Sequence, residues 1–86
     1  MGYKYPKQVL RKTYGNRCML CERVLKKDKQ SYHHRVPKSH GGKGSIENGA
    51  ILCMQCQSTI HQFEYGTEAY KTLDDLIEKN MNKYRK

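Results

Sequence analysis

Apolar residues near the start of the chain follow a helical pattern. Pro6 suits the first turn of a helix, and Val9 and Leu10 fall at helical spacing after it. Gly15-Asn16 interrupts this spacing and is typical of a helix end. The pattern therefore predicts a helix over residues 6–14.

A longer apolar stripe follows near the end of the chain. Thr67 is a favourable N-cap, and apolar positions recur every three or four residues as far as Tyr84. The pattern predicts a helix over residues 67–84 whose stripe packs on the core. A face that binds a protein partner is the alternative for the same stripe. The stripe consists of Tyr70, Leu73, Leu76, Ile77, Met81 and Tyr84.

Two short strands are predicted in the middle of the chain. The first covers residues 31–35 and is stopped by Val36-Pro37, and the second lies around residues 50–52. The stretch 38–45 between them is rich in turn-forming residues, which predicts an exposed, flexible loop.

A further helix is expected to begin at Met54, run through His61 and reach about Tyr65, where Gly66 ends it. Together these elements predict a small α+β fold in one domain covering residues 1–86. A chain of this length buries only about 60% of its unfolded surface, so an additional staple is expected.

Charge indicates the class of partner. The chain has 17 Lys and Arg against 8 Asp and Glu, a formal net charge of +9 spread along the sequence, which favours nucleic acid. The opening residues 1–6 contain no apolar stretch of secretory type, and no run approaches the roughly 20 apolar residues of a membrane span. We therefore expect a cytoplasmic protein without a membrane partner.

The cysteines form two Cys-x-x-Cys pairs, Cys18 with Cys21 and Cys53 with Cys56. Thiolates three residues apart in a tight turn point at a common centre, and two such turns supply the four ligands of a closed tetrahedral zinc site. Two disulfides are the alternative, which a reducing cytosol disfavours. A structural zinc would be the staple that so small a domain needs.

Histidines are the candidates for chemistry. Imidazoles suit a divalent cation that keeps open positions for water and substrate. His33 and His34 are adjacent on a predicted strand and point to opposite faces, so different roles are expected for them. Gln57 and His61 are four residues apart on the predicted helix, so both are expected on the face toward the strands.

Order and spacing of these residues resemble one known family, the zinc-knuckle branch of HNH endonucleases, over roughly residues 14–65. The resemblance implies a ββα-metal (His-Me finger) fold, in which a hairpin carries the paired histidines and packs on a helix that carries the last ligands. The predicted helices at 6–14 and 67–84 flank this motif. The matching residues are Cys18-x-x-Cys21, His33-His34-Arg35-Val36-Pro37, Ser39-His40-Gly41-Gly42, Asn48, Leu52-Cys53-x-x-Cys56 and His61.

The resemblance also implies roles for individual residues. His33 would be a ligand of the catalytic metal, His34 the general base, and Asn48 the residue that holds the base in position through the backbone of the hairpin loop. His61 would complete the metal site together with Gln57, which stands where the family usually has histidine and sometimes asparagine. A glutamine oxygen favours hard cations such as Mg²⁺ or Mn²⁺ over Ni²⁺ or Zn²⁺.

Three basic residues lie close enough to the predicted hairpin to contact phosphates: Arg35, Lys38 and Lys43.

The function that this resemblance implies is a metal-dependent DNA endonuclease that nicks with low sequence specificity. Such proteins are often encoded by phages or mobile elements. The cofactors expected are a structural Zn²⁺ and one catalytic divalent cation, Mg²⁺, Mn²⁺, Ni²⁺ or Zn²⁺. Two alternatives stay open: a catalytically impaired module that binds DNA, suggested by Gln57, and a zinc-stapled adaptor or inhibitor that binds a protein through its last helix.

Overall fold

The computed structural model describes residues 6–86. Lys4 and most of the opening segment, in which we expected no secretory signal, lie outside the described residues. None of the helices within residues 6–86 combines the length and the apolar character needed to cross a membrane.

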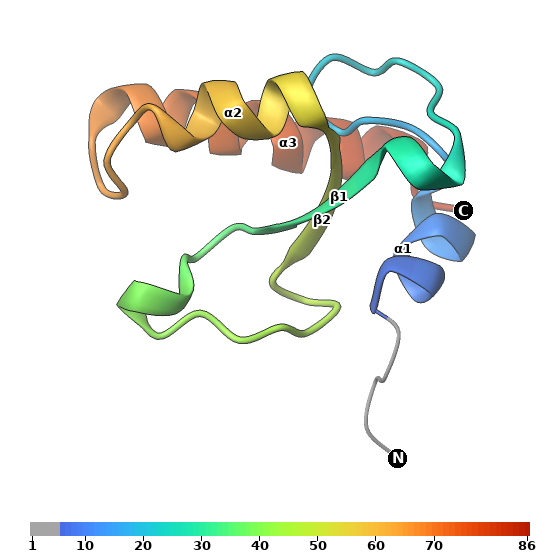
Figure 1. Ribbon diagram of the computed structural model, residues 1–86, viewed down its shortest axis with the longest axis horizontal. Coiled ribbons are helices and arrows are strands. Elements are labelled where there is room, and N and C mark those ends of the chain that lie inside the picture. Colours follow the sequence, from blue (N-terminus) through green and yellow to red (C-terminus); the bar gives the residue numbers. More distant parts are fainter. Residues whose placement is uncertain (1–5) are drawn as a thin grey trace.

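An antiparallel two-stranded hairpin lies at the centre of the fold and contacts two of the helices (Figure 1). β1 (Gln30–His34) pairs with β2 (Gly49–Cys53), with Gln30 opposite Cys53 and His34 opposite Gly49. Both strands agree with the prediction to within a residue or two; β1 ends at His34 rather than at residue 35. Every residue of β2 is buried, because helices pack against it.

α1 (Pro6–Tyr14) is one of these helices, and its predicted bounds are confirmed. Leu10 and Tyr14 are the buried residues of its inner face. Gly15 follows with a φ of 90°, and its N–H donates to the carbonyl oxygen of Arg11 at 2.8 Å. Glycine adopts this left-handed conformation without the steric cost of a Cβ, which explains the helix end.

α2 (Met54–His61) packs on both strands and begins where the sequence predicts. Cys53 is its N-cap, since the Cys53 sulfur accepts from the N–H of Cys56. The expected end near Tyr65 is wrong. The chain leaves the helix after His61 and turns, so that the Tyr65 ring packs edge-on against Tyr70 at 5.2 Å between centroids.

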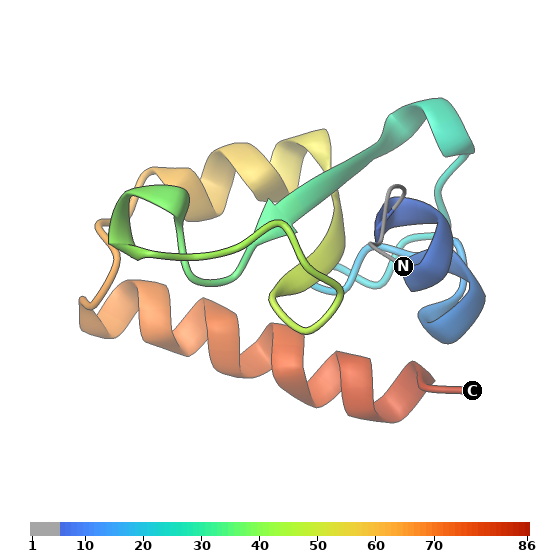
Figure 2. The same ribbon diagram turned by 90° about the horizontal axis from the view of Figure 1, so that it is seen from below.

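α3 (Glu68–Tyr84) runs back along the molecule toward α1 (Figure 2). Thr67 caps it by accepting from the N–H of Tyr70 at 3.3 Å. The predicted stripe is buried at Tyr70, Ile77 and Met81, as core packing requires, but Leu76 is 41% exposed. The buried stripe continues through a polar residue, Asn80, which is 3% exposed.

The segment between the strands contains one ordered turn, the 3-10 helix η2 (Lys38–His40). The carbonyl oxygen of Pro37 accepts from the N–H groups of His40 and Gly42, both at 2.9 Å. Part of the expected flexible loop is therefore hydrogen-bonded. A second 3-10 turn, η1 (Lys27–Lys29), leads into β1. With three helices, two strands and a cysteine cluster, the predicted small α+β fold of ββα-metal type is confirmed.

Candidate functional site

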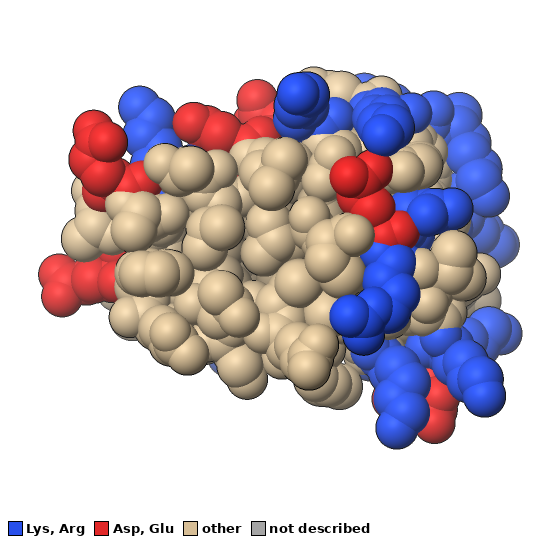
Figure 3. Space-filling model, turned by 90° about the horizontal axis from the view of Figure 1, so that it is seen from above, with Lys and Arg blue, Asp and Glu red and all other residues tan. Residues whose placement is uncertain are grey.

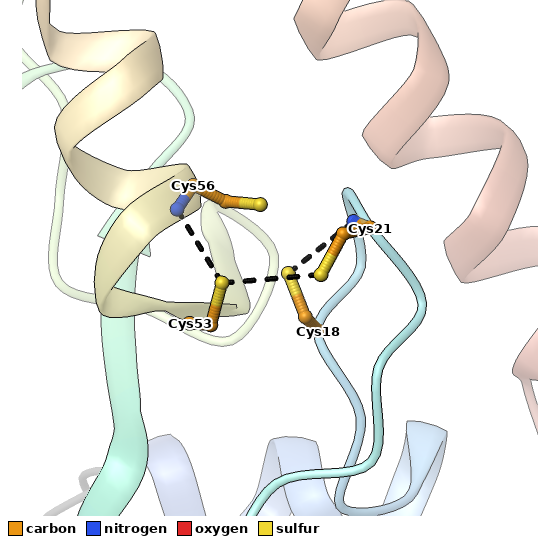
Figure 4. A group of neighbouring side chains, drawn as sticks. All are labelled: Cys18, Cys21, Cys53 and Cys56. Carbon is orange, nitrogen blue, oxygen red and sulfur yellow. Dashed lines mark hydrogen bonds between the residues drawn. The ribbon is translucent and has the colours of Figure 1, made fainter.

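The four cysteines meet between the first knuckle, which is the turn from Cys18 to Cys21, and the start of α2 (Figure 4). Their sulfur atoms all lie within 4.8 Å of one another, and Cys21 Sγ is 3.9 Å from Cys53 Sγ. All four are free thiols rather than disulfides. With Zn–S bonds of about 2.3 Å, neighbouring sulfurs of a tetrahedral zinc site are about 3.8 Å apart. The cluster is therefore a candidate structural zinc site.

The close approach of the four sulfurs resists their ionisation unless a cation lies between them. Burial and the neighbouring thiols raise the pKa of the Cys56 thiol. Four thiolates so close together need a positive charge between them. A site with four protein ligands leaves no open position, so it stabilises the fold and does no chemistry.

A second group of side chains forms where β1 crosses α2. His33 is 1% exposed, and its Nδ1 lies 2.9 Å from Oε1 of Gln57. The amide of Gln57 is oriented by its own nitrogen, which donates to Ser31 Oγ at 3.0 Å and to the carbonyl oxygen of Tyr32 at 3.2 Å. The ring of His61 lies 6.0 Å from that of His33, centroid to centroid. The structure thus brings His33, Gln57 and His61 together.

A tyrosine of α3 fixes the other side of the His33 ring. The Tyr70 hydroxyl donates its single proton to the carbonyl oxygen of Arg35 at 2.7 Å, and His33 Nε2 lies 3.5 Å from the same hydroxyl. The hydroxyl can therefore only accept from Nε2. Gln57 Oε1 can only accept, so the 2.9 Å contact is a hydrogen bond in which His33 Nδ1 donates. A cation bound at Nδ1 would displace this proton, and the remaining ring proton would then lie on Nε2, where the Tyr70 hydroxyl could accept it.

His33 Nδ1 and Gln57 Oε1 could share a cation in place of the proton that lies between them. Adjacent oxygen or nitrogen ligands at about 2.1 Å from an octahedral ion are about 3.0 Å apart, close to the 2.9 Å between His33 Nδ1 and Gln57 Oε1. Burial lowers the pKa of His33 to about 4, so its imidazole is neutral at neutral pH, the form that binds metals. His33 and Gln57, with His61 nearby, fit a divalent cation.

His34 lies at the end of β1 and lines a cleft of about 520 Å³ together with His33, Gln57 and His61. Its ring packs edge-on against Tyr32 at 4.8 Å, on the other side of the strand from His33. Among residues 6–86, no hydrogen bond holds its imidazole nitrogens. A half-buried imidazole without an internal partner is available to bind a water molecule in the cleft.

Asn48 holds the backbone directly after His34. Its Oδ1 accepts from the N–H of Val36 at 2.8 Å, and its Nδ2 donates to the carbonyl oxygens of Val36 at 3.0 Å and Lys43 at 2.9 Å. Gly42 lies against the same segment, where a Cβ would overlap the Val36 carbonyl. These contacts fix the loop that leaves β1, and with it the position of His34.

The three predicted phosphate contacts differ in their surroundings. Arg35 forms a two-bond ion pair with Asp74, at 2.9 and 3.1 Å, and a further one with Glu78 at 2.9 Å. These carboxylates raise the pKa of the Arg35 guanidinium, which stays charged, and offset its positive charge. Lys38 and Lys43 are exposed at the loop, and Lys38 lines the cleft.

Sequence reasoning missed the polar side chains of α3 that contact the hairpin. Tyr70, Asp74 and Glu78 are four residues apart and therefore share one helix face. That spacing was the available signal, but only the fold shows that this face meets the segment from His33 to Arg35.

Comparison with known families agrees with this geometry. Residues 18–63, more than half of the 86-residue chain, match the family model of the HNH endonuclease. A search of curated proteins finds no match for the chain. The match begins at the first zinc-knuckle cysteine and includes the hairpin and α2 with Gln57 and His61, but not Tyr70 of α3. The four clustered cysteines accord with the zinc-knuckle branch, and the chain belongs to the HNH endonuclease family.

Proposed function

We propose that this protein is a metal-dependent DNA endonuclease that nicks one strand with low sequence specificity. The observation that carries the proposal is the convergence of His33, Gln57 and His61 beside His34 in one cleft. A metal ligand set next to an imidazole free to accept a proton is what phosphodiester hydrolysis requires. The net charge of +9 supports DNA as the substrate.

Each side chain has a distinct part in the reaction. His33, Gln57 and His61 would hold the divalent cation, whose chemistry would be to stabilise negative charge on the phosphate and on the departing oxygen. His34 accepts the proton of the attacking water, and the bond from phosphorus to the departing oxygen breaks as the new one forms. Asn48 keeps His34 in place through its bonds to the loop backbone. One such site cuts one strand.

Nicking of supercoiled plasmid by the zinc-loaded protein tests the proposal. We expect open-circle product with added Mg²⁺ or Mn²⁺ and none without added metal. His34→Ala, purified in the same way, controls for contaminating nuclease. If no metal supports nicking while the protein still binds DNA, the protein is an HNH module that binds without cutting, the alternative that Gln57 favours. If the protein neither nicks nor binds DNA, the remaining hypothesis is a zinc-stapled adaptor or inhibitor that binds a protein.

Replacing Gln57 with histidine is expected to change the choice of metal. Imidazole binds Ni²⁺ and Zn²⁺ more tightly than a neutral amide oxygen does, so Gln57→His should raise the affinity for Ni²⁺ by about tenfold or more. Isothermal titration of the zinc-loaded protein with Ni²⁺ measures this. Ser58→His, one position along the exposed side of α2, is the control. Equal gains in both variants would remove Gln57 from the metal site.

Replacing Tyr70 with phenylalanine is expected to weaken the same site without unfolding the protein. The ring stays packed, but His33 Nε2 loses its partner, and partners of this kind are worth about 10- to 100-fold in metal affinity. Titration with Mn²⁺, followed by electron paramagnetic resonance, measures the change. Tyr65→Phe is the control because the Tyr65 hydroxyl makes no hydrogen bond within residues 6–86. Unchanged Mn²⁺ affinity in Tyr70→Phe would contradict this role.

A further inference from the structure

Positive charge is concentrated at one end of the molecule. Within residues 6–30 there are eight Lys and Arg and two Asp and Glu, a net charge of +6. The C-terminus joins the same end, because the N–H of Lys86 donates to the carbonyl oxygen of Thr13 in α1 at 2.8 Å. Figure 3 shows the Lys and Arg atoms gathered on the side of α1 and the knuckle, with a broad uncharged face beside them.

The histidine end carries little of this charge. The positive charge of Arg35 is offset by Asp74 and Glu78, and Glu64 lines the cleft together with Lys38. Lys38 and Lys43 are the lysines of the loop at this end. Because each phosphate contact adds one increment to the binding free energy, these two lysines alone would attract DNA weakly. The charge that attracts a nucleic acid therefore lies mainly away from the reacting groups.

A groove at the basic end has the form of a binding surface. We call it the knuckle groove; it has a volume of about 430 Å³ and lies between the segment after the first knuckle and the start of α2. Two of its apolar side chains are unusually exposed, Val24 at 66% and Met54 at 53%. Its cations make no ion pair within residues 6–86. The groove is lined by Arg23, Val24, Leu25, Lys26, Lys29, Cys53, Met54 and Gln55.

The hairpin sets the distance between the groove and the histidines. Lys29 directly precedes β1 at the end where Gln30 faces Cys53, and His34 is at the other end of the same strand. At about 3.3 Å per residue, the two ends of β1 are about 13 Å apart. Successive nucleotides of a DNA strand are about 3.4 Å apart along the helix axis. A DNA strand whose axis followed β1 would span about four nucleotides between His34 and the groove, and fewer in any other orientation.

We propose that the knuckle groove is the main DNA-anchoring surface, and that it binds the backbone a few nucleotides to one side of the phosphate at the histidines. This inference rests on the proposed DNA substrate. Arg23, Lys26 and Lys29 contact phosphates, and Val24 and Met54 lie against the sugars. The anchor reads no base sequence, because phosphate contacts fix position rather than specificity.

Salt-dependent binding tests the anchor without requiring cleavage. Lys26→Gln/Lys29→Gln is compared with Lys71→Gln/Lys79→Gln, a matched pair of exposed lysines on α3 with the same change in charge. The affinity for a fluorescent DNA duplex is measured by anisotropy over a range of salt concentrations. Removing two phosphate contacts should lower the slope of log K against log salt by about two and weaken binding by about 10- to 100-fold at moderate salt. The α3 pair should change the slope little.

The outcomes separate this inference from the proposed function. If the native protein nicks DNA but the groove variant and the α3 variant bind DNA with equal affinity, the proposed anchoring surface is wrong and the proposed endonuclease activity stands. If the groove pair alone loses affinity while the native protein never nicks, the anchor stands and the endonuclease fails. Native protein that binds no DNA overturns the anchor, and a negatively charged protein would then be the partner to seek. Zinc content and circular dichroism verify that each variant is folded.

Discussion

Replacing His34 with alanine is expected to lower the rate of nicking about 10²- to 10⁴-fold, the usual contribution of a general base. His34 lines the cleft next to His33, and Asn48 holds the backbone that follows it. Its imidazole makes no hydrogen bond within residues 6–86 that would compete for the proton of water. Single-turnover nicking at saturating metal measures the loss in the chemical step.

Binding separates a lost base from a damaged site. His34→Ala should bind the DNA duplex as tightly as the native protein, and its Mn²⁺ affinity should be unchanged because His34 is not a proposed ligand. His40→Ala is the matched control, since His40 lines the same cleft from the exposed loop. If both variants slow nicking equally, or if His34→Ala releases Mn²⁺, the assignment of His34 as the base is wrong.

Removal of zinc is expected to unfold the whole domain. The free energy of binding at a structural zinc site is about 10–16 kcal/mol, as large as the total stability of a typical small protein. Cys53 shows why no part survives: it is the last residue of β2, the N-cap of α2 and a member of the cluster. Loss of the metal therefore releases strand and helix together.

Thermal unfolding followed by far-ultraviolet circular dichroism, before and after a zinc chelator, measures this effect. Cys53→Ala should behave as the chelated protein does. Met54→Ala, which changes the adjacent but exposed residue, should keep both the zinc and the cooperative transition. A zinc-free protein, verified by metal analysis, that melts at the native temperature would show that the cluster is not the staple.

Local sequence patterns predicted most helices and strands of the fold. Where a helix ends and which of its residues are buried also depend on tertiary contacts, which those patterns do not contain. Helix starts and knuckle spacing are local, so α1, the start of α2 and the cysteine cluster were predictable. The early end of α2 was not, because it depends on Tyr65 packing against Tyr70 of another helix. Leu76 fits the helical stripe by spacing, but the edge of α3 leaves it exposed.

The candidate site shows the same division. The spacing of cysteine and histidine indicated His33, His34 and His61, because metal-binding residue types at fixed intervals are typical of metal sites. The ion pairs of Arg35 were not predictable, since its partners lie 39 and 43 residues further along the chain. The basic residues at the C-terminus join those of residues 6–30 because the N–H of Lys86 donates to the carbonyl oxygen of Thr13 in α1, a contact that the sequence does not indicate.

The polar contacts of α3 bear on how this domain could be shortened or grafted. The family match stops at residue 63, yet Asn80 donates to the carbonyl oxygen of Met19 at 2.8 Å, and Tyr70 donates to that of Arg35. A fragment that ended with the match would leave those carbonyls without their partners and uncover His33. In this protein the recognisable motif is shorter than the smallest piece that could be transplanted intact.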